Sequence, residues 1–165
     1  MGRKSSKENP NIYLRSREEA GLTREAAAEK LEIINADRLY RIENGDTIPY
    51  SEEVLRMTEV YKNAMIHNYY CTHECEIGKK HIAKQEEKSL SQITVEMLNA
   101  LYYLEDEKKR FTQIVADGKI TEMEYADFEN IKDKFSKMAT VIDALKLWVE
   151  QTKLADKLPE KGEER

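Results

Sequence analysis

The side chains best suited to metal or thiol chemistry lie close together near the middle of the sequence. Both cysteines and all three histidines of the 165-residue chain fall in the stretch HNYYCTHECEIGKKH. Cysteine and histidine are the usual ligands of tetrahedral zinc, and cysteines two to four residues apart are common in structural zinc sites. The candidate zinc ligands are Cys71, Cys75, His73 and His81. The alternative is a buried cysteine pair without metal, because free cysteine packs as a small apolar side chain.

No pattern in the sequence is typical of catalysis. The sequence contains no recognisable nucleophile beside a general base, no paired catalytic carboxylates and no glycine-rich phosphate loop. The stretch DGKITEMEY matches only the second half of a calcium-binding loop, and its Thr and Glu are better explained as a helix cap. We therefore expect no enzymatic activity and no cofactor, with zinc as the one alternative.

The composition indicates a helical protein with long exposed faces. Charged residues make up 36% of the chain, which contains only six glycines and three prolines. The sequence has no run of about 18 apolar residues, so we expect no transmembrane helix and no membrane association. The polar start, MGRKSSKENPN, does not resemble a secretory signal. We therefore expect a cytoplasmic protein in which the two cysteines are reduced.

The net charge of −5 lies mostly in the C-terminal half. Residues 1–50 carry nine basic and nine acidic side chains, whereas residues 83–165 carry 14 basic and 18 acidic ones. A strongly basic domain would indicate nucleic-acid binding by charge alone. In this chain a nucleic acid would have to bind through a local basic face, so the positions of individual arginines matter more than the total charge.

Residues 21–45, GLTREAAAEKLEIINADRLYRIENG, contain two short helical patterns separated by a brief turn. Thr23 is a good N-cap for a helix that runs to about Leu31, and Asn35 can cap a second helix that Gly45 ends. Isolated helices shorter than about 12–15 residues are marginal in water, so the pair must be held by packing at a defined angle. Such a pair is typical of a helix-turn-helix, in which the second helix enters the major groove of DNA.

The inward and outward faces of the helix pair differ as this hypothesis requires. Small and apolar side chains face inward, at Ala27, Leu31, Leu39 and Ile42. The outward positions are Ala36, Asp37, Tyr40 and Arg41, and Arg38 adds a second positive charge to the same helix. Arginine is the commonest side chain for bidentate contact with guanine. The next helix is expected to begin after the loop DTIP, with Ser51 as its N-cap.

Two stretches, REEAGLTREAAAEKL and RLYRIENGDTIPYSEEVLRMTEVY, resemble the lambda-repressor-like helix-turn-helix of the Cro/XRE family. The resemblance covers roughly residues 12–68 and implies a five-helix domain that binds double-stranded DNA. It implies phosphate contacts near Thr23 and Arg24, base-edge contacts by Ala36, Asp37 and Arg41, and a backbone contact by Asn44. It also implies a structural ion pair between Arg17 and Glu43.

The turn EIIN departs from the usual family form. It is one residue longer and lacks the customary glycine at its start. The register between Asn35 and Asp37 can therefore shift by one residue, and Asn35 joins the candidate DNA contacts. Asp37 would be repelled by phosphates, so it either accepts a hydrogen bond from a cytosine amino group or points away from DNA.

Two long amphipathic helices are predicted after residue 88. Mostly apolar residues recur at heptad spacing, at Leu90, Thr94, Met97, Leu101, Leu104, Lys108, Phe111 and Val115, and again at Phe128, Ile131, Phe135, Met138, Ile142, Leu145, Val149 and Thr152. The turn Asp117-Gly118-Lys119 predicts an antiparallel, coiled-coil-like hairpin. Further apolar residues flank both series, so pairing of two copies into a four-helix bundle would bury them.

These patterns together predict an all-α protein with a five-helix, lambda-repressor-like DNA-binding domain followed by a long antiparallel helical hairpin. The expected divisions are a disordered start (1–10), the DNA-binding domain (11–70), a Cys/His-containing linker (71–88), the hairpin (89–156) and a charged tail (157–165). We expect a transcriptional regulator, acting as a homodimer and by repression. The alternative is an interaction module, antitoxin-like or regulator-binding, whose acidic hairpin binds a protein partner.

Overall fold

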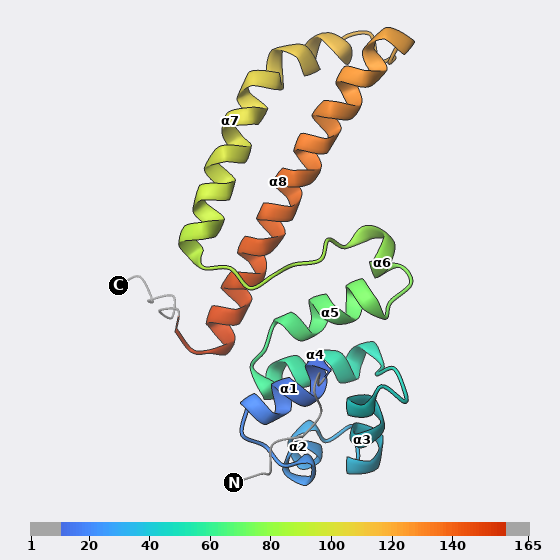
Figure 1. The fold of residues 1–165 in the computed structure, drawn as a ribbon, viewed down its shortest axis with the longest axis vertical. Helices are drawn as coiled ribbons and strands as arrows, with labels where there is room; N and C mark the ends of the chain where they lie inside the picture. Colours follow the sequence, from blue (N-terminus) through green and yellow to red (C-terminus); the bar gives the residue numbers. More distant parts are fainter. Residues whose placement is uncertain (1–10, 158–165) are drawn as a thin grey trace, which may run out of the picture. The chain divides into compact units, whose positions relative to one another are not determined.

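The described part of the chain is helical, which confirms the predicted all-α class. The computed structural model describes residues 11–157, which contain helices and no strand (Figure 1). The helices are α1 (Ile12–Glu19), α2 (Arg24–Leu31), α3 (Ala36–Asn44), α4 (Ser51–Tyr61), α5 (Met65–His73), α6 (Gly78–His81), α7 (Leu90–Ile114) and α8 (Glu122–Leu154). None of the helices in this range has the length and apolar character that a membrane span requires. The predicted disorder of residues 1–10 and the predicted tail beyond residue 157 lie outside the described residues.

The described residues form two compact units. The first contains residues 11–84 and 149–157, and the second contains residues 85–148. The first unit has a core of buried apolar side chains from α1 to α5, among them Tyr13, Leu31, Leu39, Ile42, Met57 and Ile66. Each of its short helices therefore gains stability from packing against its neighbours, which none could achieve alone.

The predicted ends of α2 and α3 are confirmed. The side chain of Thr23 accepts a hydrogen bond from the Ala26 N–H at 3.2 Å, and that of Asn35 accepts one from the Arg38 N–H at 2.8 Å. Gly45 ends α3 with a φ of 81°, a left-handed conformation that glycine adopts without the steric cost of a Cβ. Two polar side chains thus fix the starts of both helices of the pair, and one glycine fixes the end of the second.

The turn between α2 and α3 uses a strained residue where the family customarily has glycine. Glu32 has a φ of 64°, a left-handed conformation that costs a non-glycine residue roughly 1–2 kcal/mol. Two residues later, Ile34 is buried in the core. We infer that burial of Ile34 offsets the strain at Glu32 and fixes the path of the longer turn.

The segment expected to be a linker, residues 71–88, contains packed structure instead. α5 continues to His73, and α6 follows within the same compact unit. A Cβ added to Gly78 would lie 2.2 Å from the Cys71 carbonyl oxygen, so only glycine permits this close approach of α6 to α5. The polar composition of the segment concealed this packing, because the contact is made by backbone atoms.

The second unit is the expected antiparallel hairpin of α7 and the part of α8 up to Trp148 (Figure 1). Ile93 from α7 is buried with Val141 and Ala144 from α8, and Phe111 meets Phe135 edge to face with ring centres 5.3 Å apart. At the turn, the Glu124 carboxylate accepts a hydrogen bond from the Thr121 N–H at 3.1 Å, as in a capping box. The start of α8 is thus stabilised by Thr121 and Glu124, the two residues from which a helix cap was predicted.

The hairpin interface differs from the predicted heptad series. Five members of that series remain 37–48% exposed, namely Leu90, Leu101, Val115, Phe135 and Ile142. Buried positions between the helices include Ile93, one residue off the predicted line. Part of the apolar surface of both helices is therefore left in solvent.

The last residues of α8 belong to the same compact unit as α1 to α6. The Gln151 side-chain amide donates a hydrogen bond to the Lys62 carbonyl at 2.9 Å and accepts one from the Ala64 N–H at 2.7 Å. Ala64 is fully buried, so its N–H has no solvent to replace Gln151. Gln151 therefore satisfies the backbone groups that join α4 to α5.

Replacing Gln151 with leucine is expected to lower the free energy of unfolding of the first unit by about 1–3 kcal/mol. The substitution keeps the size of the side chain but leaves the buried Ala64 N–H without its partner. Urea unfolding followed by circular dichroism measures the loss. Lys153→Met, at an exposed position on the same helix, is the control. Equal stabilities of the two variants would show that the Gln151 contacts contribute nothing.

Candidate nucleic-acid interface

The outward face of α3 combines three polar side chains at helical spacing. Asp37, Arg41 and Asn44 are three or four residues apart and so share one face of the helix. The opposite face carries Leu39 and Ile42, both buried in the core. α3 therefore presents a polar face to solvent while its apolar face fixes its position in the unit.

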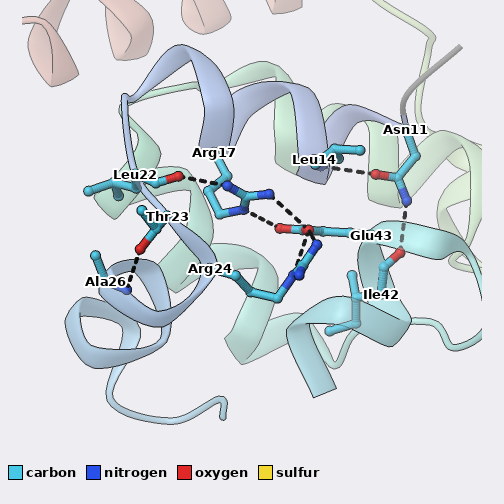
Figure 2. A network of polar contacts seen from close by, with 9 residues as sticks. All are labelled: Asn11, Leu14, Arg17, Leu22, Thr23, Arg24, Ala26, Ile42 and Glu43. Atoms are coloured by element: carbon cyan, nitrogen blue, oxygen red, sulfur yellow. Dashed lines mark hydrogen bonds and ion pairs between the residues drawn. The ribbon is translucent and has the colours of Figure 1, made fainter. Parts of the chain in front are cut away.

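A buried ion pair locks α3 to α1 (Figure 2). The Arg17 guanidinium donates to both oxygens of the Glu43 carboxylate, with Nε–Oε1 at 2.5 Å and Nη2–Oε2 at 3.1 Å. Glu43 is only 1% exposed. Burial lowers the pKa of Arg17, but its hydrogen bonds to Glu43 and the charge of Glu43 outweigh this and raise the pKa overall. Arg17 is therefore charged at neutral pH, and the pair implied by the family resemblance is present in the structure.

Two further contacts add to this network. Arg17 also donates to the Leu22 carbonyl at 2.6 Å, which holds the chain between α1 and α2. At the start of α1, the Asn11 side chain donates to the Ile42 carbonyl at 2.8 Å (Figure 2). The angle between α1 and α3 is thus fixed by hydrogen bonds at both ends of α1.

Arg24 is drawn into the same network. Its Nε and Nη2 atoms donate to Glu43 Oε2 at 3.1 and 3.0 Å (Figure 2). The guanidinium also lies over the Tyr40 ring, 4.9 Å from the ring centre. Glu43 can offset the charge of only one of the two arginines that it binds, so the three side chains together keep one positive charge, and Arg24 is about a third exposed. One buried carboxylate thus connects α1, the start of α2 and α3.

Arg38 makes a second network of the same kind. Its guanidinium donates to both oxygens of Glu53 on α4, at 2.5 and 2.7 Å, and lies 4.5 Å from the centre of the Tyr50 ring. Glu53 also accepts a hydrogen bond from the Tyr50 N–H at 2.7 Å. The N-cap of α4 is therefore Tyr50, and the prediction of Ser51 as the cap was wrong. Glu53 lies in the first turn of α4, and its carboxylate binds the backbone N–H of Tyr50. In a capping box, the residue whose N–H is bound in this way is the N-cap.

Tyr50 is an exposed residue of this surface that sequence reasoning missed as a candidate DNA contact. The spacing of Tyr50 and Glu53 in YSEE matches the outer pair of a capping box, with tyrosine where serine or threonine is usual. That spacing is the sequence pattern from which Tyr50 could have been identified as the N-cap. The arginine stacked on the ring comes from α3, twelve positions earlier, and no local pattern reveals it.

Arg41 differs from the other two arginines. No carboxylate in residues 11–157 pairs with it, and its side chain is exposed on the outward face of α3. Thr23 and Asn35 are also exposed, and the oxygens of both side chains accept the capping hydrogen bonds of their helices. Ala36 is half-buried in the first turn of α3. Of the predicted DNA contacts on α3, Arg41 is the cation whose charge is left available.

Two of the cysteine and histidine side chains contact residues close to them in the sequence. The Cys75 sulfur accepts a hydrogen bond from the Gly78 N–H at 3.4 Å, and the His73 ring stacks on Tyr69 with centres 4.3 Å apart. Burial raises the pKa of the Cys71 thiol, and the nearby Cys75 raises it further. A higher thiol pKa means less thiolate at neutral pH, so Cys71 is a weak nucleophile.

The four predicted zinc ligands, Cys71, His73, Cys75 and His81, are not assembled into one group. In the described part of the chain, no three His, Cys, Asp or Glu side chains are arranged to hold a metal ion. His81, at the end of α6, is exposed to solvent. Zinc binding therefore stays a prediction from the sequence.

Comparison with known families identifies part of the first unit. Residues 14–62 match the model of a family described as a helix-turn-helix domain. Residues 14–62 are a helix-turn-helix domain. This domain extends from α1 through α4, and the match agrees with the resemblance to the Cro/XRE family. The chain matches no curated protein and no solved structure. Helix-turn-helix domains bind DNA in general, so the outward face of α3 is the candidate interface.

Replacing Glu43 with glutamine is expected to destabilise the helix-turn-helix domain by about 3–5 kcal/mol. The change leaves the buried Arg17 charge without its counter-ion, and such a loss costs more than the pair itself contributed. Chemical unfolding measures the difference. Glu19→Gln, which affects only an exposed pair with Arg15, is the control and should change stability by less than about 0.5 kcal/mol. Similar stabilities of both variants would contradict a structural role for Glu43.

Proposed function

We propose that the protein is a sequence-specific transcriptional regulator whose helix α3 enters the major groove of double-stranded DNA. The observation that carries the proposal is the contrast between the two sides of α3. Its inner side is fixed to α1 and α2 through Glu43, and its outer side leaves Arg41 without a carboxylate partner in the described residues. A rigid helix with an available guanidinium meets the geometric requirement for bidentate contact with guanine.

Binding in the major groove explains why α2 and α3 are short and tightly fixed. A change in their angle would move the side chains of α3 away from the base edges. Thr23 and Asn35, at the starts of α2 and α3, lie where N–H groups of helix N-termini attract phosphates. Occlusion of a promoter by the bound protein is the simplest mode of action, so we propose repression.

Selection of binding sites from a random duplex library tests this function. The wild-type protein should enrich a defined sequence, and Arg41→Ala should weaken binding to it by roughly 5- to 150-fold, the equivalent of about 1–3 kcal/mol for one guanine contact. The loss should appear as relaxed preference at one position of each half-site. Arg110→Ala, with the same charge change on α7, is the control.

Failure to enrich any sequence would contradict the regulator function. Weak binding to all duplexes with equal loss in both arginine variants would indicate attraction by charge alone. The acidic hairpin would then become the candidate functional part of the chain, as a surface for a protein partner.

We also propose that the protein binds DNA as a homodimer joined through the hairpin. The exposed apolar side chains Leu90, Leu101, Phe135 and Ile142 recur at heptad positions on α7 and α8. A second copy packed against this surface would complete a four-helix bundle and remove the surface from water. Two domains joined in this way could contact half-sites about 34–36 Å apart on one side of the duplex.

Leu101→Asp is expected to convert the dimer into monomers, because a carboxylate would be buried in the bundle without a partner. Sedimentation equilibrium measures the mass. Val95→Asp is the control, since Val95 is also on α7 and more exposed but lies outside the heptad series. A monomeric wild type, or loss of the dimer in both variants, would contradict this interface.

A further inference from the structure

Two exposed tyrosines border the outward face of α3. Tyr40 is 50% exposed and shares one edge of the helix with Asn44, four residues later. Tyr50 is 64% exposed and lies against Arg38, which is three residues from Arg41 and occupies the other edge. The face that carries Arg41 therefore has an aromatic ring on each side.

Both rings are held in place by the same kind of contact. Arg24 stacks on Tyr40 and is itself held by Glu43, whose carboxylate is buried. On the other side, Arg38 stacks on Tyr50 and is held by Glu53, which also binds the Tyr50 backbone N–H. An aromatic ring with few remaining conformations loses little entropy when it contacts a partner. Each exposed ring is thus ordered before anything binds.

These contacts also change what the surface can attract. The guanidinium of Arg38 is paired with Glu53, and that of Arg24 is paired with Glu43, which also binds Arg17, so both guanidinium groups are held against their rings. Beside Arg41, this face then offers the two rings together with the polar side chains of Asp37 and Asn44. The apolar group that DNA displays in the major groove is the 5-methyl of thymine. A ring on either side of Arg41 would contact such methyl groups in a DNA site that has thymine on both sides of the contacted guanine.

We propose that Tyr40 and Tyr50 contact thymine methyl groups and so select DNA sites that carry thymine on both sides of the base pair contacted by Arg41. This inference rests on the proposed binding of DNA through α3 and names the sequence class that α3 selects. The arginines position the two rings, and the rings supply the contact. The competing possibility is that the rings only cover their arginines and never touch DNA.

Replacement of thymine by uracil in the selected duplex tests the inference, because uracil lacks only the 5-methyl group. Wild-type protein should bind the uracil duplex roughly fourfold more weakly for each contacted methyl. Tyr40→Ala and Tyr50→Ala should each bind the thymine duplex more weakly and lose the thymine preference at their own positions. Tyr102→Ala, an equally large truncation at an exposed site on α7, should behave as wild type.

The outcomes separate this inference from the proposed function. A selected site without thymine beside the guanine, or equal binding of both duplexes by wild type, would overturn the inference and leave DNA binding intact. The same uracil effect in wild type and both tyrosine variants would also overturn it, because another residue would then contact the methyl groups. Absence of any enriched duplex would instead refute the proposed function. Circular dichroism of both tyrosine variants checks that the helices are retained.

Discussion

The buried carboxylate of Glu43 is the interaction on which the geometry of the helix-turn-helix depends. Arg17 from α1 and Arg24 from the start of α2 both donate to it, while Glu43 itself belongs to α3. Three helices are therefore oriented by one side chain. Because an unpaired charge in this position would be costly, the arrangement has few alternatives of similar energy. The outward face of α3 is thus set by contacts on its inward side.

The same chemistry limits how the surface can attract DNA. Arg24 and Arg38 are held by Glu43 and Glu53, so their side chains are fixed in position, and Glu53 also offsets the charge of Arg38. The first 50 residues of the chain carry equal numbers of basic and acidic side chains, so this part of the chain has little general attraction for phosphates. Affinity would then have to come from a few well-placed contacts, namely Arg41 and the ordered rings of Tyr40 and Tyr50.

Local sequence patterns predicted the elements of this domain closely and its tertiary contacts less well. Thr23, Asn35 and Gly45 define helix ends through neighbours within four residues, so their effects can be read locally. The Arg38–Glu53 pair joins side chains fifteen positions apart, and no periodicity reveals it. The cap at Tyr50 was missed for the related reason that Glu53, rather than the capping side chain, supplies the hydrogen bond. The packing of Gly78 against Cys71 was missed because backbone atoms make it.

The heptad series shows a different limit of sequence reasoning. The period was sufficient to predict two long helices, but it could not tell which apolar residues meet within one chain and which remain outside. In the structure Ile93 and Val141 are buried between α7 and α8, whereas Leu101 and Phe135 stay exposed. Within the hairpin, neither helix can cover all of the apolar surface of the other. Packing of the remaining surface against a second partner would therefore stabilise the hairpin. A two-domain assembly would also offset the weak general attraction of each domain for DNA, since the second domain binds at a high effective concentration once the first is bound.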